Sequence, residues 1–149
     1  MSFNTANYRN LSKVGSLQKS TDIVLVDKPT YKITMGDFFK LCSDYHDSNK
    51  DENVDPLGLT EAILHLIDTK CCHIPKMDKL NTLVECGSRV KTTMGESHWL
   101  GHLLDFCIGV TLLTYTAKGD ITKHEEFPKI ADMWKNFVDN LPTDEDIPA

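Results

Sequence analysis

Two histidines at the head of the most apolar segment are the residues whose spacing most suggests chemistry. The stretch "GESHWLGHLLDFCIGVTLLTYTAKG" covers residues 95–119 and places His98 and His102 four residues apart. Side chains four apart share one side of a helix, so both imidazoles could bind one metal ion. A metalloprotease of the His-Glu-x-x-His type needs a glutamate directly after the first histidine, where this chain has Trp99. The alternative, which we favour, is that Ser97 caps the helix and both histidines form hydrogen bonds at the edge of the core.

A metal ion on His98 and His102 would require one or two further ligands. The candidates precede or belong to the neighbouring predicted helix, and they are His73 and Cys86, with Cys71 and Cys72. They could reach the histidines only if that helix packs beside the start of the apolar segment, and no Cys-x-x-Cys pair supports such a site. We therefore predict no metal and no other cofactor, and the alternative is a metal site on the two histidines.

Other residues suited to catalysis occur without the partners that catalysis needs. Cys86 in "ECGS" is expected at a helix end, directly before a glycine. Asp105 falls within the apolar segment, where we expect it to face a lysine, an arginine or a histidine. The chain has no glycine-rich phosphate loop, no dinucleotide fingerprint and no Gly-x-Ser-x-Gly turn. The sequence therefore favours a protein that is not an enzyme.

The elements that must position these residues begin with an extended segment. "DIVLV" (22–26) and "YKIT" (31–34) flank a turn built on Pro29, which predicts a short hairpin or two extended segments. Thr34 and Asp37 then resemble a capping box, with an aspartate in place of the usual glutamate. Apolar residues at helical spacing follow, so a first helix is expected there.

Four more stretches carry the helical pattern. Asp55 and Pro56 suit the N-cap and first position of the second helix. A third helix is predicted to end at Gly87, a residue suited to a left-handed cap. The fourth covers residues 97–118, and the fifth begins at Pro128. The fourth is apolar on two faces, so we expect neighbours on both sides of it and a central place in the fold.

The predicted fold class is mainly α: a single-domain bundle of about five helices with a short extended or hairpin segment near the N-terminus. A chain of 149 residues with 40% hydrophobic residues is long enough to bury a core. The expected core comprises Phe38, Leu41, Ile63, Leu66, Leu80, Leu83, Leu103, Phe106, Val110, Leu113, Trp134 and Phe137.

The two ends of the chain carry opposite charge. We divide the chain into an extended basic arm (1–21), a helical domain (22–142) and an acidic tail (143–149). The arm contains three bases and no acid, and the tail contains three acids and no base. The arm has too few apolar groups to fold alone, so we expect it to lie against another chain or in a groove. The expected partner-binding residues are Tyr8, Arg9, Lys13, Lys19, Asp144, Glu145 and Asp146.

Composition limits the partners and the compartment. A net charge of −6 argues against nucleic acid as a partner. His102 and Asp105 interrupt the longest apolar stretch (99–117), so we predict no membrane span. Five cysteines, an odd number without the spacing of secreted domains, predict reduced thiols and an intracellular, cytoplasmic protein. The basic, Ser- and Asn-rich arm leaves an organelle as the alternative location.

These features together predict a non-catalytic helical interaction protein, either a subunit of a larger assembly or a small regulatory binder. It would contact a protein partner, or further copies of itself as a homo-oligomer, through its arm and tail. The alternative is a small metal-binding protein or metal-dependent enzyme that uses His98 and His102. Elemental analysis of the purified protein would separate the two hypotheses.

Overall fold

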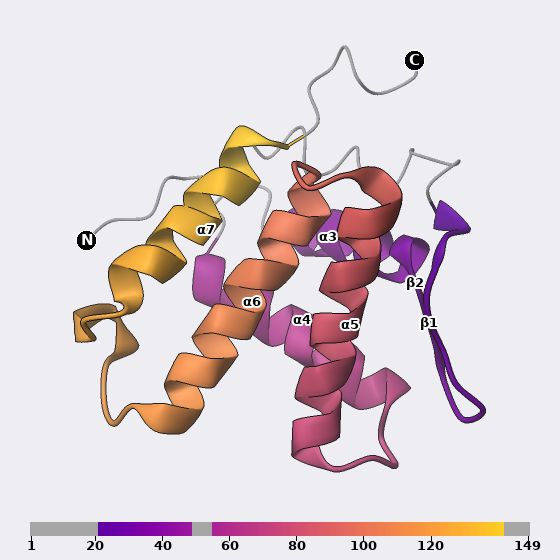
Figure 1. Ribbon diagram of the computed structural model, residues 1–149, viewed down its shortest axis with the longest axis horizontal. Coiled ribbons are helices and arrows are strands. Elements are labelled where there is room, and N and C mark those ends of the chain that lie inside the picture. Colours follow the sequence, from indigo (N-terminus) through magenta and orange to yellow (C-terminus); the bar gives the residue numbers. More distant parts are fainter. Residues whose placement is uncertain (1–20, 49–54, 142–149) are drawn as a thin grey trace.

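The computed structural model describes residues 21–48 and 55–141. Within that part, five helices accompany one short hairpin, as Figure 1 shows. The hairpin pairs β1 (Val24–Asp27) with β2 (Lys32–Thr34), and the helices are α3 (Met35–Ser48), α4 (Pro56–Lys70), α5 (Lys76–Met94), α6 (Trp99–Thr116) and α7 (Phe127–Asp139), with a 3-10 turn, η2 (Ile121–Lys123), before α7. α5, α6 and α7 lie side by side in one layer, and α3 and α4 cross behind it. The predicted fold class is confirmed.

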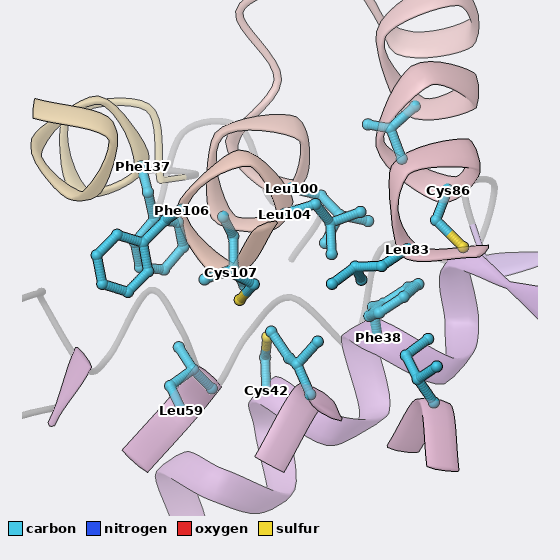
Figure 2. Close-up of a cluster of buried hydrophobic side chains, with 14 of the residues drawn as sticks. Phe38, Cys42, Leu59, Leu83, Cys86, Leu100, Leu104, Phe106, Cys107 and Phe137 are labelled. Atoms are coloured by element: carbon cyan, nitrogen blue, oxygen red, sulfur yellow. The ribbon is translucent and has the colours of Figure 1, made fainter. Parts of the chain in front are cut away.

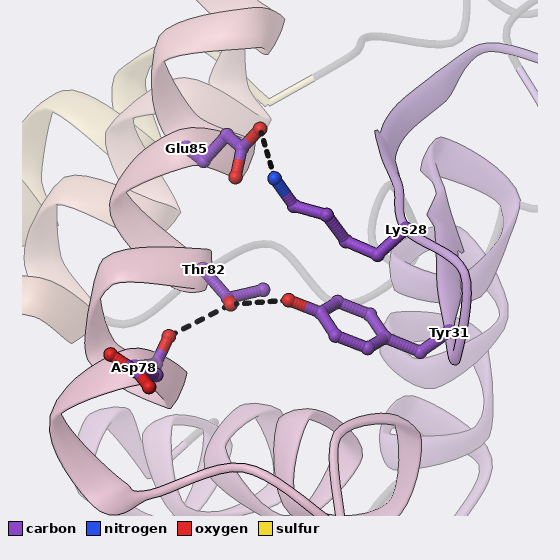
Figure 3. Close-up of polar contacts among 5 residues, drawn as sticks. All are labelled: Lys28, Tyr31, Asp78, Thr82 and Glu85. Carbon is purple, nitrogen blue, oxygen red and sulfur yellow. Dashed lines mark hydrogen bonds and ion pairs between the residues drawn. The ribbon is translucent and has the colours of Figure 1, made fainter.

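The hairpin closes around Pro29, as the sequence predicts, and packs on α5. Its strands are antiparallel, and the backbone N–H of Lys28 donates to the carbonyl of Tyr31 at 3.0 Å. Figure 3 shows how it is held: the Tyr31 hydroxyl lies 3.1 Å from the hydroxyl of Thr82, which itself donates to a backbone carbonyl of α5. An ion pair of 3.8 Å joins Lys28 to Glu85. The hairpin is therefore attached through its turn to the middle of α5.

The first two helices begin where their capping residues predict. The Thr34 backbone N–H donates to the Asp37 carboxylate at 2.8 Å, and the Asp37 N–H donates to the Thr34 hydroxyl at 3.3 Å. This reciprocal pair is a capping box with aspartate as the acid. Asp55 caps α4 by accepting the N–H of Leu57 at 3.1 Å, and Pro56 is the first helical residue.

The predicted end of the third helix is wrong. α5 continues through Gly87 to Met94, and the residue that ends it is Gly95, with a φ of 96°. Gly87 is instead buried in the interior of the helix, where α6 packs against it. A glycine marks a helix end only where the backbone takes a positive φ, and the buried residues on both sides of Gly87 keep the backbone helical.

α6 is the central helix, as its two apolar faces predict. It packs against α4, α5 and α7. Figure 2 shows its Leu100, Leu104, Phe106 and Cys107 pointing into the cluster of buried side chains that α3, α4 and α5 complete. No helix among the described residues is long and apolar enough to cross a membrane.

The predicted core is largely confirmed. Ten of the twelve expected residues are buried, and the exceptions are Leu41 and Leu66, which are half-buried and pack against the edge of the cluster. Leu41 on α3 and Leu66 on α4 both line the open junction between those two helices, so each keeps one side toward solvent. Periodicity identifies the apolar face of a helix, but it does not show where that face extends beyond its neighbour.

Candidate binding site

His98 has a structural role that differs from the predicted one. It is itself the N-cap of α6, and its Nδ1 accepts the backbone N–H of Leu100 at 3.1 Å, so the prediction of Ser97 as the cap is wrong by one residue. The ring also packs on Trp99, with centroids 5.5 Å apart. Burial, and secondarily the neighbouring His102, lowers the pKa of His98 to about 4. His98 is therefore neutral at physiological pH, with one ring nitrogen engaged by the helix.

The residues that could complete a metal site with the histidine pair lie elsewhere. α5 and α6 run antiparallel, so His73, just before α5, lies at the other end of the helix pair. That separation is about 28 Å along the 19 residues of α5. Cys86 is buried on α5; burial raises the pKa of its thiol, and Cys71 and Asp37 are close enough for their charges to raise it further. Across residues 21–48 and 55–141, no group of three or more His, Cys, Asp and Glu side chains is placed to hold a metal ion.

The buried thiols are held in their protonated form. Burial raises the pKa of Cys86 to about 12 and that of Cys107 to about 12, and it raises the pKa of Cys42 further. Figure 2 shows the sulfur atoms of Cys42, Cys86 and Cys107 inside the apolar cluster. Because the thiolate is the nucleophilic form, these three side chains act as small apolar groups of the core.

Asp105 has the polar partner that its place in an apolar helix predicts. The Nζ of Lys91 on α5 lies 2.8 Å from its carboxylate, and both side chains are about 30% exposed. Gly101, one turn earlier on α6, lets the stem of Lys91 pass close to the α6 backbone, because a Cβ there would lie 3.4 Å from the Cγ of Lys91. This ion pair fastens α5 to α6.

A cavity that the sequence did not reveal opens at the opposite end of α6. It has a volume of about 590 Å³ and lies between α4, the start of α5, the C-terminal part of α6 and η2. Six apolar side chains from these four elements line it: Leu57, Leu64, Ile67, Leu80, Val110 and Ile121. The volume lies within the range of small-molecule sites, roughly 300–1,000 Å³.

Two lysines lie at one end of this cavity. The Nζ of Lys79 is 3.0 Å from the carboxylate of Asp68, and the Nζ of Lys76 stands 4.3 Å from the centre of the Tyr115 ring. Both lysines belong to the first turn of α5, whose N-cap Pro75 makes no side-chain cap. The positive end of the α5 dipole adds to the charge of the lysines, so this end of the cavity favours an anionic group.

In the described part of the chain, the exposed large apolar side chains lie on α5 and α6. Among the described residues these side chains are Met77, Val84, Leu112 and Tyr115, each 40–56% exposed. Met77 and Val84 are seven residues apart, and Leu112 and Tyr115 are three apart, so each pair occupies one side of its helix. We call these four residues the α5–α6 face. α5 and α6 belong to the layer that α3 and α4 cross (Figure 1).

The residues predicted to bind a partner through the chain ends lie outside the described part. These are Tyr8, Arg9, Lys13 and Lys19 in the arm, and Asp144, Glu145 and Asp146 in the tail. Sequence reasoning singled out neither the cavity nor the α5–α6 face. Leu112 and Tyr115 carried a weak signal, since both are large apolar side chains in the C-terminal part of α6.

Comparison with known proteins does not add a relative. No family model matches the chain, and no curated protein and no solved structure matches it.

Proposed function

We propose that this chain is a non-catalytic helical interaction protein, a subunit of a larger assembly or a small regulatory binder. The observation that carries the proposal is the α5–α6 face, made by Met77, Val84, Leu112 and Tyr115. These side chains are exposed on two helices that pack against each other, and a contiguous apolar surface is typical of a site that a partner covers. A protein partner with an apolar helix would bury these side chains and release the water that covers them.

The charged ends of the chain supply the second part of the proposed interaction. The arm adds Arg9, Lys13 and Lys19 without an acid, so the remainder of the chain is more acidic than the net charge of −6. The arm would be attracted to an acidic surface of a partner or of a second copy, and the acidic tail to a basic one. Exposed charges are screened over roughly 10 Å at 0.1 M salt, so these contacts should weaken as salt is added.

The reactive side chain types support a role without catalysis. Cys86 and Cys107 are buried as neutral thiols, and His98 caps a helix. Asp105 forms an ion pair with Lys91. Each of these groups has a partner or an environment that explains it as part of the fold. The metal hypothesis gains no third ligand from the described residues.

The test is a charge placed on the α5–α6 face. Leu112→Glu adds one negative charge at an exposed position of that face, and Asn136→Glu adds the same charge at an exposed position of α7, outside it. Sedimentation velocity at rising concentration measures self-association, and circular dichroism checks the fold. We expect the wild type and Asn136→Glu to associate equally, and Leu112→Glu to remain a folded monomer.

A wild-type protein that stays monomeric would exclude an assembly of identical chains and would require a different protein as partner. Affinity purification with all three versions would then identify proteins retained by the wild type and Asn136→Glu but lost with Leu112→Glu. Binding must be reproduced with the purified partner. If no protein shows this pattern, the α5–α6 face is not an interaction surface.

Deleting residues 2–20 tests the arm separately. We expect the shortened protein to keep the thermal stability of its helical domain and to lose association at low salt. If both the stability and the assembly size are unchanged, the arm makes no contact that matters to the interaction.

A further inference from the structure

The cavity between α4, α5, α6 and η2 has an elongated shape and two different ends. Its lining on α4 extends from Leu57 to Asp68, about 16 Å along the helix axis. Lys76, Lys79 and Tyr115 lie at the Asp68 end. Leu57, with Val110 on α6, belongs to the other end, because Thr60 of α4 contacts Cys107 of α6 there.

The walls between these ends offer few free hydrogen-bond donors. Thr60, Thr111 and Thr114 line the cavity, but their hydroxyls donate to the backbone carbonyls of Pro56, Cys107 and Val110 at 2.7–3.0 Å. A threonine whose proton is used within its own helix presents mainly its methyl group and an acceptor oxygen to the cavity. The walls therefore suit a hydrocarbon chain better than a sugar or a nucleotide, whose hydroxyls would need partners.

The charged side chains at the Asp68 end of the cavity indicate which polar group a ligand would carry. Lys76 has the Tyr115 ring as its partner and is exposed, so it can pair with an incoming anion without losing another ion pair. Lys79 can share its ammonium group between Asp68 and that anion. The remaining acid of the lining, Glu61, is seven residues from Asp68 on α4, about 10 Å along the helix, so it does not compete for the lysines.

We propose that this cavity binds a long-chain carboxylate. Its acid group would pair with Lys76 and Lys79, and its hydrocarbon chain would lie between Leu64, Ile67 and Leu80 toward Val110. The site lies beside the α5–α6 face and shares Tyr115 with it. It rests on a separate observation from the proposed interaction, so either proposal can fail alone.

The experiment uses the full chain, freed of co-purified lipid, and isothermal titration calorimetry with dodecanoate below its micelle concentration. Dodecanol has the same chain length without the charge and serves as the matched probe. We expect one dodecanoate per chain and about tenfold weaker binding of dodecanol. Lys76→Gln should weaken dodecanoate about tenfold and leave dodecanol unchanged, because a charged partner is worth roughly a factor of ten.

Two further variants test whether dodecanoate binds in this cavity. Thr114→Trp places a large ring in the cavity and should abolish binding of both probes, with circular dichroism showing an unchanged fold. Lys135→Gln removes a lysine from an exposed ion pair on α7, away from the cavity, and should bind dodecanoate as the wild type does. The proposal is overturned if the wild type does not bind dodecanoate, if dodecanol binds equally well, or if folded Thr114→Trp still binds it.

Discussion

The two ends of α6 are packed in different ways. At its start, Trp99 packs against Phe39 of α3 and Phe137 of α7, with tilted rings and centroid distances of 5.4 and 6.3 Å. Phe106 continues this packing against Trp134 at 5.1 Å. At its C-terminal end, Leu112 and Tyr115 are exposed and the cavity opens beside them. One helix thus has a closed end and an open end.

The two ends of α6 differ in the kind of evidence for function that each contains. The closed end contains the histidine pair, whose residue types suggest chemistry, yet His98 there serves the fold as a helix cap. The open end contains ordinary residue types, leucine, threonine, lysine and tyrosine, yet it has the free volume and the exposed surface that binding requires. Residue type and free volume therefore point to opposite ends of α6.

The largest expected effect is at the closed end. Phe106→Ala should lower the free energy of unfolding by roughly 3–5 kcal/mol, because it removes a fully buried ring and leaves a cavity against Trp134. Leu103→Ala should cost roughly 2–5 kcal/mol, because it leaves a cavity where a fully buried leucine side chain was. Chemical denaturation followed by circular dichroism measures both. Losses below about 1 kcal/mol at both positions would mean that α6 is not the central helix.

The next effect depends on pH and on His98. Its pKa in the folded protein, about 4, lies below the ordinary value of 6.5, so the unfolded chain binds more protons between these values. His98 therefore does not lower the free energy of unfolding above pH 6.5. As the pH falls from 6.5 toward 4, the free energy of unfolding decreases by no more than about 1.4 kcal/mol per pH unit. Partial solvent exposure reduces that slope.

His98→Asn is the matched variant for this prediction, because asparagine can accept the same backbone N–H but does not titrate. Denaturant unfolding at pH 7.5 and pH 5 should show a larger loss for the wild type than for the variant. Equal losses would show that His98 is not held neutral at the closed end.

A pair of glycine substitutions tests whether α5 ends at Gly87 or at Gly95. Gly87→Ala should raise stability by about 0.5–1 kcal/mol, because alanine suits a helix interior better and its methyl would lie 3.6 Å from the Cβ of Leu104, an ordinary contact. Gly95→Ala should lower stability by about 1 kcal/mol, because φ is positive there. Thermal and chemical denaturation give both signs. The opposite pattern would place the helix end at Gly87.

The smallest effect belongs to the open end. Leu112→Ala should change stability by less than about 0.5 kcal/mol, since nearly half of the side chain is already exposed. The same denaturation experiment as for Phe106→Ala provides the comparison. A loss approaching that of Phe106→Ala would mean that Leu112 is covered by another part of the chain, and the contrast between the two ends would disappear.

Local signals in the sequence determined most of the elements. Thr34 with Asp37, and Asp55 with Pro56, specify where two helices begin, because the bonds that cap a helix form between residues two or three apart. The turn at Pro29 and the apolar periodicity of α6 and α7 are equally local. Such local features are enough to specify the mainly α class, the hairpin and most of the core.

Only the tertiary structure decided the roles of Gly87 and His98 in the fold and the presence of the cavity. Gly87 could end a helix or accept a neighbouring helix, and the packing of α6 against it determined the second use. The sequence predicts that His98 lies just inside the helix, and the fold instead places it at the N-cap, where it accepts the backbone N–H of Leu100. The cavity is lined by side chains from four elements, and no single segment of the sequence shows how far apart these elements lie. Neighbouring residues determine caps and turns, whereas the volume between helices depends on the position of every helix at once.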